Sequence, residues 1–273
     1  MTPQSPASLG ARFDVREYAR TARGNHRDEL QLADYATAPL DPESLHAIRY
    51  YARLESATME HLRNLLVTAT HKDARVTAFL VTWAFEKFWI ADALDAVLEA
   101  NGRPRAQDED EGETRHSRSE ASERRGPIRR ALAAIAQGVP IIALHMAMGL
   151  VDEWVMRAAY ERLAARSESA ALSSTVALIL DVKKRHAAFF EDEAVRRLTD
   201  SARAVRQTRR TLPRIAWPIG SIDRAAIDRS FFESYVFGGD EGAARARDLG
   251  TQVSALPGMT RSIGDAVAQG LRP

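Results

Sequence analysis

The chain has 273 residues, of which 45% are hydrophobic and 27% are charged, values that are ordinary for a globular protein with a substantial buried core. Its 38 basic and 37 acidic residues give a net charge of +1, which argues against nucleic acid or an anionic membrane as the main partner. The chain contains no cysteine. Disulfides, thiolate nucleophiles and zinc–thiolate or iron–sulfur sites are therefore excluded, and any metal would need histidine and carboxylate ligands.

Neither the N-terminal segment nor the most apolar run predicts a secreted or membrane protein. The segment from Met1 to Arg23 is polar and lacks the apolar core of a signal peptide. The longest apolar run, 139–151, is interrupted by His145 and Gly149 and falls short of the roughly 20 residues that span a bilayer. We expect a cytoplasmic protein.

The first 40 residues mix proline, serine, glycine and charge without periodicity, which predicts a mostly irregular N-terminal arm. A helix is predicted to begin at Asp41, because an aspartate N-cap is followed by Pro42 at the first helical position and by Glu43 in the first turn. Apolar residues then recur at helical spacing to about Thr70.

A second helix is predicted over 74–99, with Asn101-Gly102 as a fitting C-terminal cap. Its surface is apolar on most sides, as expected of a buried helix, and Glu86 and Lys87 interrupt that surface. Residues 103–125, with an acidic run followed by serine and arginine, predict a solvated, flexible linker.

The second half of the chain repeats the alternation of long helices and breaks. No segment shows sustained strand alternation, so the predicted fold class is all-α. The segments are a short helix over 127–136, a third long helix over 140–166, a fourth over 171–198 that continues in register to Arg210 before Pro213, and a helical C-terminal cap over 213–273 with short helical patterns near 223–235 and 241–256.

Four charged residues are predicted to point into the core at one level, although the alternative for Lys87 and Lys183 is that their side chains extend to solvent at the bundle surface. Glu55 lies within the apolar stripe of the first long helix, although Glu60 is the alternative there, and Glu153 lies within the stripe of the third. Lys87 follows Glu55 by 32 residues (55 to 87), and Lys183 follows Glu153 by 30 (153 to 183). Near-equal spacing is what two copies of a helical hairpin would give, with corresponding residues meeting inside a bundle.

Two segments carry a resemblance to a known superfamily. Glu153 with residues 160–164, followed by Lys184-Arg185-His186-Ala187-Ala188-Phe189-Phe190, resembles the third helix and the D-E-x-R-H-x-x-F-F/Y helix of ferritin-like di-iron carboxylate proteins, closest to their acyl-carrier-protein desaturase and oxygenase branches. Residues 82–90 more faintly resemble the family's W-x-x-E-E-x-x-H segment. The resemblance covers 41–200. It implies a ferritin-like four-helix bundle over 41–212, with one Glu on each of two helices and Glu-x-x-His on the other two.

The sequence departs from that family at the metal ligands. The fourth-helix pair is Lys183 with His186, and the second-helix pair is Lys87 with Ile90. An ammonium is repelled by a metal and, at the reference lysine pKa near 10.4, cannot ligate one. Two inward glutamates and two inward lysines are expected to form buried ion pairs instead. The family ligands that remain are Glu55, Glu153 and His186.

Two classes of function stay open on the sequence. The first is a metal-deficient protein without a cofactor that binds a small apolar molecule in the bundle cavity or a protein partner; the resemblance also implies that such bundles pair as homodimers. The second is an enzyme, either an oxidoreductase with iron or manganese at the remnant ligands or a metal-free catalyst that uses Lys87 or Lys183, since a desolvated lysine can lose its proton and act as a base or nucleophile. The sequence does not identify a substrate.

Overall fold

In the computed structural model the described residues, 12–106 and 138–273, are helical with connecting turns and contain no strand. The predicted all-α class is confirmed for this part of the chain. The predicted linker, from residue 107 onward, and the predicted helix over 127–136 lie outside the described residues. Across the two described ranges, no helix is both long enough and apolar enough to cross a membrane.

The first long helical segment begins where its capping residues predict. The side chain of Asp41 accepts a hydrogen bond from the Ser44 backbone N–H, and Pro42 opens α3 (Pro42–Ser56). The helix does not run unbroken to Thr70: it is interrupted at Ala57, after which α4 (Thr58–Leu66) and the 3-10 turn η2 (Ala69–Lys72) complete the segment.

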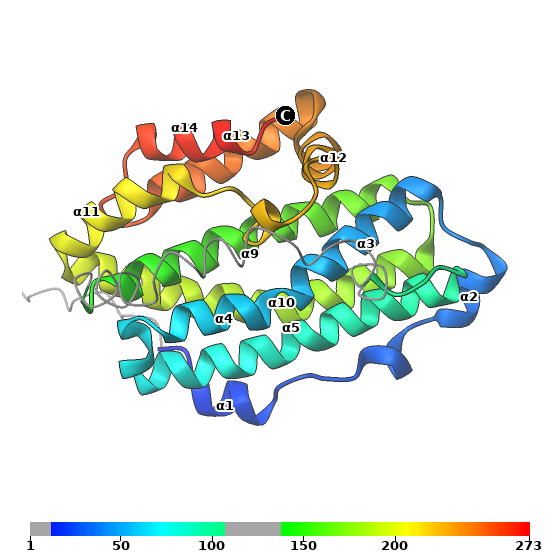
Figure 1. Cartoon of the computed structure of the whole chain (residues 1–273), viewed down its shortest axis with the longest axis horizontal. Helices are drawn as coiled ribbons and strands as arrows, with labels where there is room; N and C mark the ends of the chain where they lie inside the picture. Colours follow the sequence, from blue (N-terminus) through cyan, green and yellow to red (C-terminus); the bar gives the residue numbers. More distant parts are fainter. Residues whose placement is uncertain (1–11, 107–137) are drawn as a thin grey trace, which may run out of the picture.

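Three long helices form the rest of the core. They are α5 (Ala74–Ala100), α9 (Ile141–Arg166) and α10 (Ala170–Asp200). They pack along one another and along α3 (Figure 1). Asn101 and Gly102 end α5 as predicted, with Gly102 at a φ of +69°. The predicted continuation of α10 to Arg210 is wrong, because Ser201 is extended and its side chain caps a separate helix, α11 (Ala202–Thr211).

The N-terminal arm is more ordered than its composition predicts. It forms α1 (Val15–Arg20), η1 (His26–Glu29) and α2 (Leu32–Thr37), each of which packs on α5 (Figure 1). The Tyr35 hydroxyl lies 2.8 Å from the Thr175 hydroxyl of α10, and the Leu40 N–H donates to the Asn101 side chain at 2.8 Å. Helices this short give no readable periodicity, so the sequence pattern predicts an irregular chain there.

The C-terminal part forms a helical layer over α9 (Figure 1). After η3 (Leu212–Arg214) and η4 (Ser221–Asp223) come α12 (Ala226–Phe237), α13 (Gly239–Ala255) and α14 (Arg261–Gly270). The helices α12 and α13 match the short helical patterns predicted near 223–235 and 241–256, whereas α14 was not predicted. Gly250 of α13 and Gly264 of α14 let the two backbones approach closely.

Gly149 sets the spacing between α9 and α10, the two helices with the most extensive mutual packing. A Cβ added at Gly149 of α9 would overlap the ring of Phe190 on α10. That ring is buried against Phe79 and Trp83 of α5, so it has no free space to move into.

We expect Gly149→Ala to destabilise the protein by about 1–3 kcal/mol, because overpacking a filled core forces backbone or side-chain shifts. Gly270→Ala is the matched control, since a Cβ there meets nothing within 4 Å. Urea denaturation of the two variants checks this, and equal midpoints would contradict the close approach of α9 and α10.

Candidate functional site

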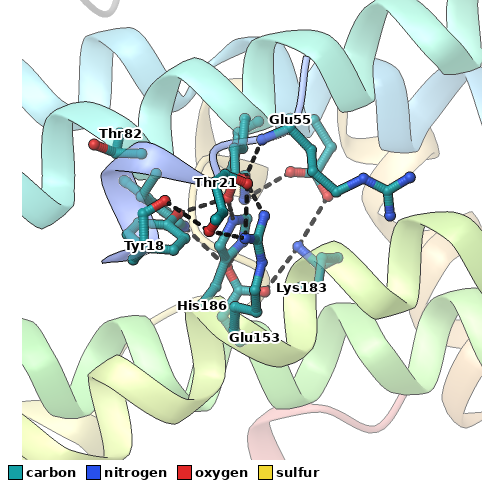
Figure 2. Close-up of polar contacts among 12 residues, drawn as sticks. Tyr18, Thr21, Glu55, Thr82, Glu153, Lys183 and His186 are labelled. Atoms are coloured by element: carbon teal, nitrogen blue, oxygen red, sulfur yellow. Dashed lines mark hydrogen bonds and ion pairs between the residues drawn. The ribbon is translucent and has the colours of Figure 1, made fainter. Parts of the chain in front are cut away.

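The structure brings all the sequence-predicted site residues together. Glu55 of α3, Lys87 of α5, Glu153 of α9, and Lys183 and His186 of α10 are each at most 3% exposed. Their side chains converge between the four helices (Figure 2). Of the two glutamates that could point inward from the first long helical segment, Glu55 does so, because Glu60 is exposed to solvent.

The expected Glu–Lys ion pairs are present. Lys183 Nζ lies 3.1 Å from Glu55 Oε1 and 2.8 Å from Glu153 Oε2, so it bridges the two carboxylates (Figure 2). Lys87 Nζ lies 2.7 Å from the second oxygen of Glu55. Tyr160 donates to Glu55 at 3.0 Å, and the Trp83 indole donates to Glu153 at 3.0 Å. We call Glu55, Lys87, Glu153 and Lys183 the ion-pair core.

The electrostatics of the ion-pair core favour its charged form. Burial alone would raise the pKa of Glu153, but the charge of Lys183 and the contact with His186 outweigh burial and hold it well below its usual 4.5. The charges of Lys183 and Lys87 lower the pKa of Glu55 in the same way. Burial would lower the pKa of Lys183, yet Glu153 and Glu55 raise it above the usual 10.5. Lys183 therefore stays protonated and cannot act as a nucleophile.

Glu86 is the residue of the site that sequence reasoning missed. It is fully buried and lies next to Lys87 on α5, and its two oxygens accept from four groups. The donors are the Tyr18 hydroxyl at 2.6 Å, the Arg23 backbone N–H at 2.7 Å, the His186 Nε2 at 2.8 Å and the Arg185 guanidinium. Burial would raise the pKa of Glu86, but His186 and Tyr18 lower it on balance. Glu86 matches the first glutamate of W-x-x-E-E, which is the signal that was available.

His186 joins Glu86 to the ion-pair core. Its Nδ1 lies 3.4 Å from Glu153 Oε1, while its Nε2 faces Glu86. Polar contacts therefore run from Tyr18 of α1, through Glu86 and His186, into the ion-pair core, and end at Tyr160. Figure 2 shows His186 between Tyr18 and the ion-pair residues Glu153, Lys183 and Glu55. This line ties the N-terminal arm to α5, α9 and α10.

The residues present do not fit a di-metal centre. Both oxygens of Glu55 and one oxygen of Glu153 face lysine ammonium groups at 2.7–3.1 Å, where a metal cation would have to bind. The remaining oxygen of Glu153 accepts from Trp83, and His186 is oriented by Glu86. Two ammonium charges at this level repel further cations. Over residues 12–106 and 138–273, no group of three or more His, Asp or Glu side chains is arranged to hold a metal ion.

A small cavity of about 30 Å³ lies beside the ion-pair core, between α4, α5, α9 and the Ile219-Gly220 turn. Its polar wall consists of His61, Lys87, His145 and Asp152, and Trp83 and Phe190 are among its apolar neighbours. The volume suffices for one or two water-sized groups. His145 lines this cavity, and its Nδ1 lies 2.8 Å from the Thr70 hydroxyl.

Burial controls the titration of the cavity wall. It lowers the pKa of His61 to about 4, with a further contribution from the charge of Lys87, and lowers that of His145 to about 4. Burial raises the pKa of Asp152 to about 6, although Lys87 and the Ile219 backbone N–H, which donates at 2.7 Å, oppose the rise. At neutral pH the wall therefore presents two neutral imidazoles, a carboxyl group and an ammonium group.

We expect Lys183→Met to lower the free energy of unfolding by about 3–5 kcal/mol, because it leaves two buried carboxylates without their shared cation. The melting temperature should fall by roughly 10 °C for a chain of this size. The double variant Lys183→Met with Glu153→Leu should be less destabilised, since one of the stranded charges is removed. Lys184→Met, at an exposed position on the same helix, is the control. A Lys183→Met variant that melts with the wild type contradicts the bridge.

The cavity histidines should make stability depend on pH between about 6.5 and 5. Their pKa values fall from 6.5 to about 4 on folding, so the unfolded chain binds more protons and stability decreases as the pH falls. Asp152 has the opposite effect on stability below about pH 6. Its pKa is raised on folding, so the folded state binds the proton more tightly and stability increases as the pH falls.

One histidine and Asp152 should nearly cancel, so His145→Gln is expected to flatten the pH dependence of the urea midpoint over this range. Replacement of the exposed His71 by glutamine should leave the wild-type slope unchanged. An unaltered slope in His145→Gln would show that its imidazole is not the source.

Comparison with known proteins identifies no relative. No protein-family model matches the chain, and no curated protein or solved structure matches it either. The resemblance to ferritin-like carboxylate proteins therefore depends on the sequence motifs, and what it implies about fold and function is a proposal.

Proposed function

We propose that this protein is a metal-independent member of the ferritin-like type, in which α3–α4, α5, α9 and α10 form the four-helix bundle, and that it binds a small polar molecule beside Lys87. The ion-pair core supports the first part. Its residues come from the four helices at one level and at the hairpin spacings of 32 (55 to 87) and 30 (153 to 183) that suggested two related halves. In this proposal two ammonium groups take the structural role of two metal cations.

The binding proposal depends on the position of Lys87, which belongs to the ion-pair core and also lines the cavity. Its ammonium group contacts one carboxylate, Glu55, whereas Lys183 contacts two. The same Lys87 side chain forms part of the cavity wall. An ammonium group has three donors, so Lys87 keeps donors for a molecule in the cavity, whereas Lys183 is not among the residues that line the cavity.

The wall defines the chemistry of that molecule. Lys87 supplies donors, Asp152 supplies an acceptor, and each imidazole offers an acceptor or a donor according to its tautomer. Glu55 and Asp152 disfavour a strongly anionic ligand, because their charges oppose it at neutral pH. A molecule of two or three non-hydrogen atoms with both a donor and an acceptor fits best, such as formamide or methanol. The polar wall favours this class over the apolar ligand expected from the sequence.

A second candidate function is lysine-dependent chemistry at the same place. The Lys87 nitrogen borders a space that a small aldehyde could enter, and attack on the carbonyl carbon with loss of water would give an imine. Reduction with borohydride would convert this imine to a stable secondary amine. Peptide mapping that finds the adduct on Lys87, and not on Lys183, favours this candidate; no adduct leaves non-covalent binding as the better account.

Metal content tests the structural part of the proposal. Purified protein is expected to contain far less than one equivalent of iron or manganese, and added Fe(II) or Mn(II) should not raise the melting temperature, because ligand that binds only the folded state would stabilise it. Near-stoichiometric metal with a matching rise in melting temperature would refute the metal-independent centre.

Ligand binding tests the second part. Formamide, methanol and ethanol are the probes, and at least one should raise the melting temperature in proportion to the logarithm of its concentration. The effect should disappear in Lys87→Met and in His61→Leu, the latter of which leaves the ion-pair core intact, and should persist in Lys184→Met. Wild-type protein that responds to none of the probes would count against the cavity as a binding site.

A further inference from the structure

A groove lies between α11 and the turn that follows α13, at the opposite end of the molecule from α2 (Figure 1). It has a volume of about 490 Å³ and is open to solvent. The end of α10, the first half of α11 and the turn supply its apolar part, which consists of Leu198, Ala202, Val205 and Pro257. Two arginines of α11, Arg206 and Arg209, also line the groove.

Gly258 brings the turn against α11. Its φ of +74° lies in the region that favours glycine, and a Cβ at this position would overlap the side chain of Val205. The Gly258 carbonyl accepts a hydrogen bond from Nε of Arg209. This bond holds the Arg209 side chain beside the groove and leaves the N–H groups of its two terminal nitrogens for a ligand.

The positive charge of the groove is not balanced by neighbouring acids. Residues 201–222 contain five arginines and no Asp or Glu. Since the net charge of the whole chain is +1, the residues outside this stretch sum to −4 (1 − 5). Within 12–106 and 138–273, no carboxylate forms an ion pair with Arg206 or Arg209. Both side chains are exposed, so their guanidinium groups are accessible to a partner that carries negative charge.

We infer that this groove binds an extended acidic peptide. An aliphatic side chain of the peptide occupies the apolar part, and Asp or Glu side chains on either side of it meet Arg206 and Arg209. The two arginines are three positions apart and therefore lie on one side of α11. Each guanidinium can form two parallel hydrogen bonds with a carboxylate. This inference does not depend on the ligand proposed beside Lys87 or on the type of bundle.

The shape and the side chains of the groove favour a peptide over other anions. Pockets for small molecules bury most of the ligand surface, whereas this groove is open. Its apolar residues are aliphatic, and no aromatic ring on which a nucleic acid base could stack is among the described residues that line it. The near-neutral net charge of the chain also gives little long-range attraction to DNA or to an anionic membrane.

A titration with labelled peptides tests the inference. The probe is the fluorescein-labelled peptide Gly-Asp-Glu-Leu-Glu-Asp-Gly, and its matched control is Gly-Asn-Gln-Leu-Gln-Asn-Gly. Fluorescence anisotropy with the full chain should show that the acidic peptide binds roughly tenfold more tightly or better, because charge-assisted hydrogen bonds are stronger than neutral ones. Equal affinity for the two peptides, or binding of neither, would overturn the inference.

Charge reversal at the groove locates the site. Arg206→Glu should remove the preference for the acidic peptide and keep the wild-type melting temperature, because Arg206 is an exposed residue. Lys184→Glu makes the same change of charge on α10, at an exposed position 14 residues before Leu198 (184 to 198) and thus about 21 Å away along the helix. It should bind the peptide like the wild type. Wild-type affinity in Arg206→Glu, or an equal loss in Lys184→Glu, would refute binding at this groove.

The apolar part of the groove and the class of partner have their own tests. A peptide in which glycine replaces the leucine should bind several-fold more weakly, since it leaves the apolar surface of the groove uncovered. Duplex DNA and vesicles of phosphatidylglycerol should not displace the acidic peptide at equal concentrations of negative charge. Unchanged affinity of the glycine peptide, or displacement by either competitor, would contradict a peptide-binding groove.

Discussion

The ammonium group of Lys183 is the contact on which the interior of the bundle depends. It is the shared cation of Glu55 and Glu153, and it sits on the same helix as His186, which connects the pair to Glu86. A buried charge of this kind costs several kcal/mol to desolvate, and only partners at hydrogen-bond distance from every side offset the cost. The four helices must therefore stand at one axial level, since a shift of one turn would strand at least one charge in an apolar core.

Glu86 extends the same constraint to the N-terminal arm. The Glu86 carboxylate, near the middle of α5, accepts from Tyr18 and Arg23 and so fixes α1 against the bundle. The phenol and the backbone amide in turn satisfy a charge that would otherwise be buried without partners. Order in the arm and order in the core are thus coupled. The arm encloses the site, although its own helix has only six residues and could not be stable alone.

Local chemistry explains which features the sequence predicts. Asp41 and Pro42 at the start of α3, and Asn101 and Gly102 at the end of α5, act only on the backbone next to them, so the sequence alone identifies them. Glu55 is predictable because it interrupts an apolar stripe at helical spacing. The break at Ser201 is not predictable in this way, because the sequence of α11 continues the helical register of α10. Only the Ser201 cap and the packing of α11 end α10 there.

Tertiary distance explains what the sequence does not show. Glu86 interrupts the apolar α5 just as Lys87 does, and nothing local tells which neighbours the two charges meet. Its partners lie more than 60 residues before it and about 100 after it, so spacing along one helix could not identify them. The sequence could likewise predict Glu–Lys pairs but not that one lysine would hold two carboxylates.

The unequal division of carboxylate contacts between Lys183 and Lys87 makes the two sides of the ion-pair core different. With two glutamates and two lysines the ion-pair core is neutral overall, but Lys183 takes two of the three close contacts and Lys87 takes one. A symmetric arrangement would have used both ammonium groups fully and left an inert, closed centre. Because Lys87 retains donors and lines the cavity with His61 and Asp152, the neutral core presents one side on which a polar molecule can compete with water. Lys183 and Lys87 thus occupy the carboxylate oxygens that a metal would need, and Lys87 also contributes hydrogen-bond donors to the cavity wall.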